Sequence, residues 1–158
     1  MIKILVFDQQ NDLSIDIESA KQVIRRVLEL EKSQANEVSL YFVSTKEICR
    51  LHEEFFHDPS PTDCISFPID RNRKLGYQFL GEIFVCPKTA LDFVQTYEDI
   101  NENPYVETTL YVVHSVLHLL GFDDIEEVDR KKMRAKEGVI MQHLLKANIL
   151  LKAVVSQL

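Results

Sequence analysis

Cysteine is scarce in this chain of 158 residues, since only Cys49, Cys64 and Cys86 occur and no two of them have C-x-x-C spacing. An odd number of cysteines without such a pair predicts neither a disulfide framework nor a zinc site made of thiolates. Free thiols are typical of a reducing compartment, and we therefore expect a cytoplasmic protein.

A long apolar run is also lacking at the start of the chain. The apolar stretch at residues 1–7 ends at Asp8, which makes it too short for the body of a signal peptide or for a membrane span. We therefore expect a protein that is not exported and has no membrane partner.

Positive charge is in the minority, because 25 acidic residues outweigh 18 basic ones and give a formal net charge of −7. Non-specific affinity for RNA comes mainly from neutralised phosphates, so this charge argues against a generic nucleic-acid coat. It does not exclude an RNA enzyme, because a bound divalent ion and a few basic groups can reverse the sign of the field in a cleft. Basic residues that could contribute, and that could equally form solvated faces, are Arg71, Arg73, Lys74, Lys131, Lys132, Arg134 and Lys136.

No repeat and no linker divides the sequence, so residues 1–158 are expected to form one domain. Its size allows it to bury roughly two-thirds of its unfolded surface. Apolar patterning predicts strands at residues 2–7, 38–43, 64–69 and 80–86, and helices at residues 15–30, 44–56, 88–97, 104–120 and from 126 to the C-terminus. The fold class is therefore α+β, with about four strands in a mixed sheet packed with helices and the last two strands paired as an antiparallel hairpin.

Several side-chain positions follow from the same patterns. We expect Ser14 to cap the first helix, Phe55 to face the core and His52 to lie at the surface. Glu82 is expected either to support a metal site or to face solvent. In the helix at 104–120 the apolar residues fall on one narrow face that should be buried, and they are Val106, Leu110, Val113, Leu117 and Leu120.

The end of that helix is the most informative stretch of the sequence. His114 and His118 lie one turn apart, so both imidazoles can converge on one point. Gly121 can take a left-handed conformation after the helix, which lets the chain turn back and bring Asp123 or Asp124 beside the histidines. A buried core histidine needs neither a glycine stop nor paired carboxylates, so the combination favours a metal site on the helix and the turn that follows it.

This ligand set, two imidazoles and a carboxylate, suits zinc and would also accept nickel, cobalt or manganese. Three protein ligands leave one position open for water, whose pKa a divalent ion lowers from about 16 to about 7. That is the chemistry of a hydrolase. A zinc peptidase of the His-Glu-x-x-His type is disfavoured, because Ser115 stands where its glutamate would act as general base.

Three motifs resemble those of one known family. Residues 114–124 read His-Ser-Val-Leu-His-Leu-Leu-Gly-Phe-Asp-Asp. They resemble the signature of the YbeY family of metal-dependent endoribonucleases, which runs His-Gly-x-Leu-His-Leu-x-Gly-Tyr-Asp-His. Residues 61–68, Pro-Thr-Asp-Cys-Ile-Ser-Phe-Pro, are similar to its Pro-Thr-Asp-Val-Leu-Ser-Phe-Pro, and residues 81–86, Gly-Glu-Ile-Phe-Val-Cys, to its Gly-Asp-Ile-x-Ile-Cys. The order and spacing match as well, and the resemblance covers nearly the whole chain.

The sequence departs from the family pattern at three positions. Asp124 replaces the third histidine, which adds negative charge and favours harder ions. Phe56 stands where the family usually carries an arginine, thought to act near the scissile phosphate, and the adjacent His57 could carry positive charge there. Ser115 replaces a glycine, and a helix tolerates serine at this position. The resemblance implies His114, His118 and Asp124 as metal ligands and catalytic centre, and we add as candidate substrate contacts His57, Asp63, Ser66, Arg71 and Arg73. Asp63 could equally be a turn former.

By this resemblance, the chain is a zinc-dependent endoribonuclease specific for single-stranded RNA. The implied role is rRNA maturation at the 16S rRNA 3′ end and ribosome quality control. The implied partners are rRNA, the small ribosomal subunit, one of its ribosomal proteins and the GTPase Era. Because Phe56 and Asp124 both depart from the family pattern, a metal-stabilised ribosome assembly factor with little nuclease activity remains the alternative, and hydrolysis of another ester or amide is a third. The residues do not decide whether hydroxide or a ribose 2′-OH attacks.

Overall fold

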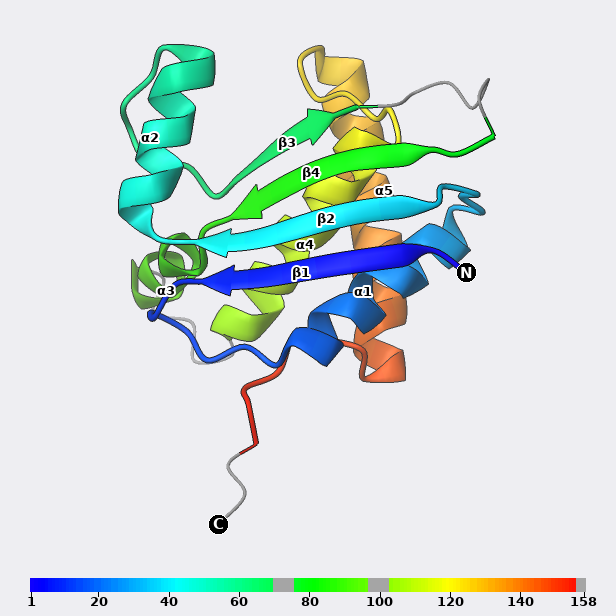
Figure 1. Cartoon of the computed structure of the whole chain (residues 1–158), viewed down its shortest axis with the longest axis horizontal. Coiled ribbons are helices and arrows are strands. Elements are labelled where there is room, and N and C mark those ends of the chain that lie inside the picture. The colour runs from blue at the N-terminus through cyan, green and yellow to red at the C-terminus, as the bar shows by residue number, and fades with distance from the viewer. Residues whose placement is uncertain (70–75, 97–102, 156–158) are drawn as a thin grey trace.

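The structure is a computed structural model, and it describes residues 1–69, 76–96 and 103–155. These residues form a sheet of four strands, β1 (Lys3–Gln9), β2 (Glu37–Val43), β3 (Cys64–Pro68) and β4 (Phe79–Val85), in the order β1-β2-β4-β3. β1, β2 and β4 run parallel, whereas β3 pairs antiparallel with β4. The predicted α+β class, the mixed sheet and the hairpin of the last two strands are confirmed (Figure 1).

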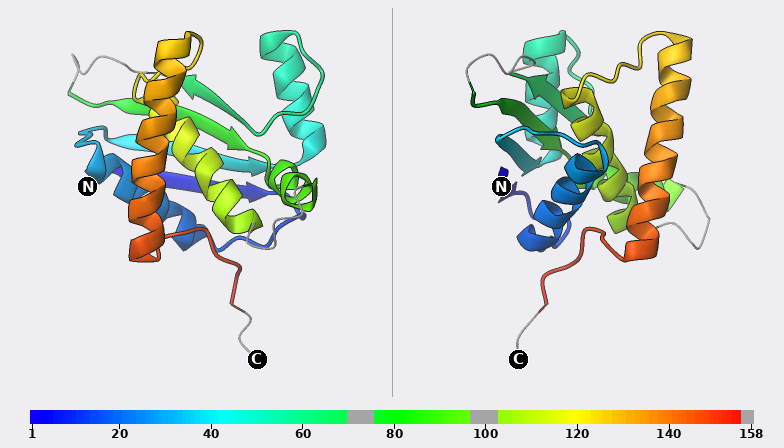
Figure 2. Two further views of the ribbon diagram at one scale, coloured as in Figure 1. Left: turned by 180° about the vertical axis from the view of Figure 1, so that it is seen from behind. Right: turned by 90° about the vertical axis from the view of Figure 1, so that its right-hand side faces the viewer.

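The helices form two groups around this sheet. They are α1 (Ile17–Leu30), α2 (Thr45–Phe56), α3 (Pro87–Thr96), α4 (Pro104–Leu119) and α5 (Glu127–Ala147). α1, α4 and α5 lie on one face, with α4 between the sheet and α5 (Figure 2). On the other face Ile48 and Leu51 of α2 pack against Ile65 of β3. None of the helices in the described ranges is both long and apolar enough to cross a membrane.

α4 is the central helix of the domain, since it contacts β3, β4, α1, α3 and α5. Its buried side chains therefore cover most of its circumference, and the prediction of one narrow buried face is wrong. Val112 and Val116, outside that face, are fully buried, while Val106 and Leu110, on it, are only half-buried. Buried hydroxyl groups are tolerated because each donates to a backbone carbonyl one turn earlier, as the Ser115 hydroxyl does at 2.8 Å.

α4 packs closely on β4 at Gly81. Its φ is +154°, and a Cβ atom here would lie 2.4 Å from Phe67 O and 2.7 Å from Leu119 Cδ2. A residue without a side chain lets the last turn of α4 pack directly on the backbone of the sheet. Packing beneath the helix end therefore explains the glycine that opens the motif at residues 81–86.

Two predicted helix boundaries are wrong. α1 begins after Asp16, and the Ser14 hydroxyl accepts a hydrogen bond from the backbone of Val154 instead of capping the helix. α5 does not continue to the C-terminus but ends at Ala147, because Asn148 takes the left-handed conformation with a φ of 55°.

Residues 149–155 instead run back along α1 and α4. The backbone N–H of Leu151 donates to Thr109 Oγ1 of α4, and that of Lys152 donates to Ser19 Oγ of α1, both at 3.1 Å. This segment therefore ties the two helices together on the covered face of the sheet.

The other face of the sheet carries a row of aromatic side chains, one from each strand and one from α2. Adjacent ring centroids are 4.8–5.7 Å apart along the row Phe7, Tyr41, Phe84, Phe67 and Phe55. Phe55 is 53% exposed, so the prediction that it faces the core is wrong. Glu82 also lies on this face, where burial and the neighbouring carboxylate raise the pKa of Tyr41. Glu82 thus faces away from α4, on which the metal ligands were predicted.

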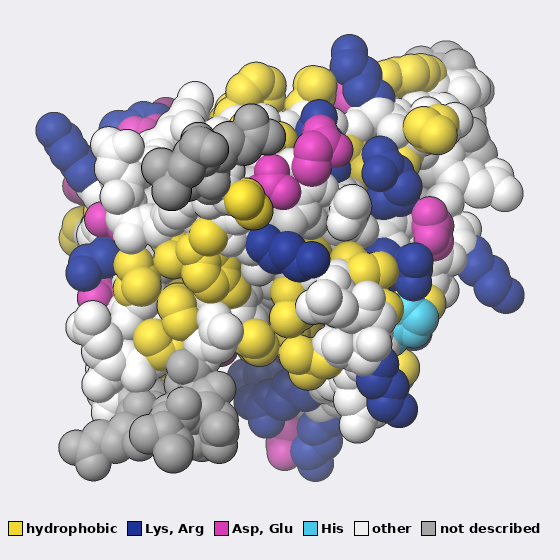
Figure 3. All heavy atoms as spheres, turned by 90° about the horizontal axis from the view of Figure 1, so that it is seen from below, with side chains coloured by type: hydrophobic (Ala, Val, Ile, Leu, Met, Phe, Trp, Pro, Cys, Tyr) yellow, Lys and Arg dark blue, Asp and Glu magenta, His cyan; other side chains and the backbone are white. Residues whose placement is uncertain are grey.

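The underside of the molecule, on the β1 side of the sheet, is shown in Figure 3. Lys and Arg side chains are spread around several apolar patches there, and only a few Asp and Glu side chains are visible. The negative net charge is therefore not carried by this face, which lies away from β3.

Candidate metal centre

His114, His118 and Asp124 form the one group, within residues 1–69, 76–96 and 103–155, whose ligand atoms are close enough to hold a metal ion. The two histidine Nε2 atoms are 3.0 Å apart, and Asp124 Oδ2 lies 3.5 Å from that of His114 and 3.3 Å from that of His118. Two ligand atoms at the roughly 2.0–2.1 Å typical of zinc stand about 3.3 Å apart in a tetrahedral site. The spacing therefore fits a bound ion.

The chain reversal after α4 places the carboxylate. α4 ends at Leu119, and Gly121, with a φ of +103°, turns the chain back. Asp123 Oδ1 then accepts hydrogen bonds from the backbone N–H of Asp124 at 2.7 Å and of Ile125 at 3.2 Å, so this carboxylate stabilises the return. Asp124 is left to face the histidines, and of the two aspartates it is the one that joins the group.

Both imidazoles are oriented by an acceptor at Nδ1. His118 Nδ1 lies 3.0 Å from Phe122 O, and His114 Nδ1 is hydrogen-bonded to Glu137 Oε1. A carbonyl and a carboxylate only accept, so each Nδ1 carries a proton and each Nε2 offers a lone pair. Two such lone pairs and a carboxylate oxygen repel one another unless a cation lies among them. The chemistry of the donor set therefore fits a metal ion.

Glu137 on α5 is a residue of the candidate site that sequence reasoning missed. Its side chain is only 15% exposed. Burial disfavours charge on His114, but the hydrogen bond and charge of Glu137, with the charges of Asp63 and Asp124, outweigh burial and raise the pKa of His114. Glu137 is four residues after the buried Met133, and a carboxylate on the apolar stripe of α5 was the signal that could have found it.

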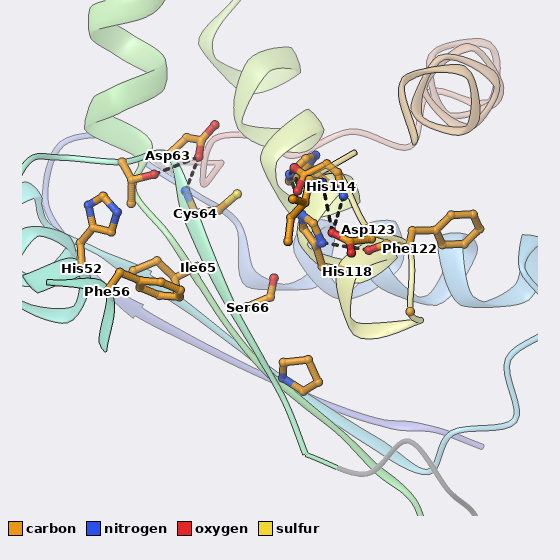
Figure 4. A pocket seen from close by; sticks show the side chains of 15 residues that line it. His52, Phe56, Asp63, Cys64, Ile65, Ser66, His114, His118, Phe122 and Asp123 are labelled. Carbon is orange, nitrogen blue, oxygen red and sulfur yellow. Dashed lines mark hydrogen bonds and ion pairs between the residues drawn. The ribbon is translucent and has the colours of Figure 1, made fainter. Parts of the chain in front are cut away.

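A cleft of about 600 Å³ opens beside this group. We call its ligand-bearing side, formed by His114, His118 and Asp124, the metal wall. We call the side formed by His52 and Phe56 of α2 the α2 wall. Figure 4 shows the two histidines of the metal wall and the two rings of the α2 wall on either side of β3.

Asp63 and Ser66 lie between the two walls and line the cleft. Asp63 Oδ1 accepts a hydrogen bond from the backbone N–H of Cys64 at 2.7 Å, which stabilises the start of β3. Ser66 Oγ donates to Ser115 O at 3.2 Å and so ties β3 to α4. Both residues thus have a structural role and are also exposed to whatever enters the cleft.

The other candidate residues are placed differently. His57 ends α2 with a φ of 58°, is exposed and does not line the cleft. Arg71 and Arg73 lie outside the described residues. His52, expected at the surface, is instead half-buried in the cleft, because its ring packs against the cleft-lining Phe56 one turn later on α2.

Comparisons with known proteins agree on one family. A model of the family described as "Endoribonuclease YbeY" matches residues 5–145. A relative of that description from Protochlamydia amoebophila is 43% identical over 145 residues, 92% of this chain and 95% of the relative. Another from Chlamydia trachomatis serovar D is 39% identical over 154 residues, 97% of this chain and 94% of the relative.

A solved structure supports the fold. The solution structure of a Thermotoga maritima protein matches with a TM-score of 0.62 and 24% identity, covering 93% of this chain and 91% of that one. The family model covers most of the chain, and the relatives cover nearly all of it at about two identical residues in five. The chain therefore belongs to the YbeY endoribonuclease family.

Proposed function

We propose that the chain is a zinc-dependent endoribonuclease that cleaves single-stranded RNA in the cleft beside the metal wall. The proposal is carried by the convergence of three ligand atoms in an open cleft, in a chain whose relatives are named endoribonucleases. Two imidazoles and a carboxylate at tetrahedral spacing favour zinc, and Ni²⁺, Co²⁺ or Mn²⁺ would accept the same ligands.

Each residue of the site has a defined task in this proposal. His114, His118 and Asp124 hold the ion, while Glu137 and the carbonyl of Phe122 keep the imidazole lone pairs aimed at it. When bound, such an ion stabilises the negative charge that develops on the scissile phosphate and lowers the pKa of water. A carboxylate ligand in place of a third imidazole reduces the net positive charge at the centre, and therefore its strength as a Lewis acid.

The remaining candidate residues are proposed to contact the substrate. Asp63 and Ser66 lie in the cleft, where the carboxylate can accept a hydrogen bond from a ribose hydroxyl or a base amino group. His57 is not among the cleft-lining residues, and Arg71 and Arg73 lie outside the described residues. We assign them to RNA that extends beyond the cleft.

In the cell, we place the protein in rRNA maturation at the 16S rRNA 3′ end and in ribosome quality control. Family membership supports this role and its partners, which are rRNA, the small ribosomal subunit, one of its ribosomal proteins and the GTPase Era. The three cysteines are free, which supports a cytoplasmic location.

A metal-stabilised ribosome assembly factor with little nuclease activity is the second candidate. It is favoured by Phe56, which stands where the family usually carries an arginine, and by the absence of Lys and Arg among the cleft-lining residues of the described chain. Without such a cation, less charge is available to stabilise the transition state.

The test begins with metal content, measured by mass spectrometry on untagged protein purified without chelator. We expect about one ion per chain, and cleavage of single-stranded RNA but not of its duplex by the loaded protein. Asp124→Ala should lose both the ion and cleavage, whereas the exposed carboxylate variant Asp92→Ala should keep both. A loaded wild-type protein that cleaves no RNA would refute the nuclease. If Asp124→Ala folds and still supports rRNA processing in cells, the assembly factor is correct.

A comparison of RNA with its 2′-deoxy analogue then identifies the attacking group. Equal cleavage of both would exclude attack by the 2′-OH, while cleavage of the ribose form alone would support it.

A further inference from the structure

Phe56 is an exposed aromatic side chain of the cleft, and its ring packs against that of His52. It is 55% exposed, and the cleft in which it lies also carries polar groups, among them Thr62, Asp63, Ser66 and the metal wall. Single exposed apolar residues are common at protein surfaces. Phe56 differs because the cleft in which it lies is the one that holds the metal group.

The ring of Phe56 has a firm support. The imidazole of His52 packs against it with ring centroids 5.8 Å apart and an interplanar angle of 56°. His52 is itself fixed by Nδ1, which lies 2.7 Å from Ser60 O, and Ser60 is held by hydrogen bonds from its N and Oγ to Asp58 Oδ1. The loop after α2 thus holds one side of the ring in place. A ring held in this way loses little conformational freedom when a ligand packs on it.

The charges in the cleft indicate how an RNA chain would be held there. No Lys or Arg is among the cleft-lining residues in the described parts of the chain, whereas Asp63, Asp123 and Asp124 are. Phosphates therefore find no cationic side chain on the α2 wall, and their attraction is concentrated at the metal group. What the α2 wall offers to a nucleic acid is an aromatic surface.

Aromatic rings bind unpaired bases by stacking, and they do so with little sequence preference. In a duplex the faces of the bases are already stacked on their neighbours and are not free to pack on a protein ring. We propose that Phe56 is the base-binding residue of the cleft: its ring stacks on an unpaired base while a neighbouring phosphate of the same strand lies at the metal wall. This inference rests on the proposed function, and it gives preference for single strands a physical origin in the α2 wall.

The chain offers a closely matched control in Phe55. It is the same residue type on the same helix, is 53% exposed, and packs edge-on against Phe67 with ring centroids 4.8 Å apart. It does not line the cleft. Phe55→Ala therefore removes the same exposed group from α2 without changing the α2 wall.

The first experiment compares cleavage by metal-loaded variants with that of the wild type on one single-stranded 12-nucleotide RNA. Phe56→Ala and Phe56→Leu should lower kcat/KM about tenfold or more. Phe56→Tyr, which keeps the ring, should lose less than Phe56→Ala, and Phe55→Ala should stay near the wild-type value. Circular dichroism checks that each variant is folded, which we expect because both phenylalanines are largely exposed. Equal activity of Phe56→Ala and wild type would overturn the inference and leave the proposed function standing.

The second experiment locates the stacked base. The same RNA is prepared with a single abasic nucleotide at successive positions around the cleavage site. At one position the abasic nucleotide should lower kcat/KM of the wild type about as much as Phe56→Ala does. At that position it should lower kcat/KM of Phe56→Ala no further, because both changes remove the same contact. Abasic losses that are equal in the two proteins at every position would overturn the assignment.

The third experiment does not depend on cleavage. The chain contains no tryptophan, so Phe56→Trp carries the only one. Its fluorescence should be quenched by the single-stranded 12-mer, in metal-free and metal-loaded protein, and much less by the duplex or by the abasic RNA. Quenching without cleavage by the wild type would refute the proposed function but support base binding. No quenching by any RNA, with Phe56→Ala failing to bind small ribosomal subunits, would overturn base binding in favour of a protein contact.

Discussion

The two walls of the cleft differ in the side chains that form them and in how those side chains are held. In the metal wall each imidazole is fixed by a hydrogen bond at Nδ1, one of them to a carboxylate from another helix. In the α2 wall the exposed Phe56 packs against the ring of His52. Fixed polar geometry is what a metal ligand requires, whereas an exposed flat ring suits a ligand whose sequence varies. The proposed function and the proposed base contact assign chemistry to one wall and substrate binding to the other, so variants of the two walls should fail in different ways.

Removal of a metal ligand should have the largest effect. His118→Ala takes away one of three ligand atoms, and we expect loss of the ion and a fall in RNA cleavage of about a thousandfold. Metal content and kcat are the measurements. His143→Ala, which removes a histidine that contacts Arg26 far from the cleft, is the control. If His118→Ala kept its ion and its activity, the metal wall would have been assigned wrongly.

A change beneath the metal wall should act through stability. In Gly81→Ala the new Cβ atom meets Phe67 O and Leu119 Cδ2, which pushes the end of α4 off the sheet. We expect a loss of about 2–3 kcal/mol in the free energy of unfolding, measured with urea. Gly138→Ala in α5 meets nothing within 4 Å and should instead stabilise by roughly 0.5–1 kcal/mol. Equal stability of the two variants would contradict the packing described at Gly81.

Loss of the carboxylate behind the metal wall should weaken the site without destroying it. Glu137→Ala leaves His114 without its acceptor, and we expect metal affinity to fall between about tenfold and a hundredfold. Glu137→Gln keeps an acceptor oxygen and should lose less. Glu127→Ala, an exposed residue of the same helix paired with Lys131, should change nothing. Titration of metal-free protein with Zn²⁺ measures all three, and an unchanged affinity in Glu137→Ala would show that orientation by α5 is not needed.

The smallest expected effect concerns charge on the α2 wall. Phe56→Arg introduces one cation into a lining that has no Lys or Arg among the described residues. Each phosphate neutralised on a single strand steepens the dependence of log affinity on log salt concentration by about 0.7. Binding of single-stranded RNA measured from low to high salt should therefore show a slope steeper by about that amount. An unchanged slope would mean that phosphates do not reach this wall, which would confine them to the metal wall.

Local patterns made the metal wall predictable. His114, His118 and Asp124 lie within eleven residues, and helix geometry plus one glycine turn brings them together without reference to the rest of the fold. The strands and their mixed pairing also follow from patterns that need only a few residues each. Sequence patterns best predict the relative positions of residues that lie close together in the chain.

Long-range geometry could not be predicted in the same way. Glu137 reaches His114 only because α5 packs across α4, and the α2 wall faces the metal wall only because β3 runs between them. The apolar pattern of α4 was misjudged because a helix covered on most sides has no single narrow buried face. The end of α5 was missed because a left-handed Asn148 stops a helix without interrupting its apolar pattern.

The hydrogen bond between His114 and Glu137 joins α4 and α5 at the candidate metal site. Because the ligand lies on α4 and its orienting carboxylate on α5, occupancy of the site and docking of α5 are linked equilibria. A ligand that binds only the docked form stabilises that form by mass action, in proportion to the logarithm of its concentration. Degradation that starts from the open form then follows how often α5 detaches. The supply of the proposed metal ion would thus contribute to how long each copy survives.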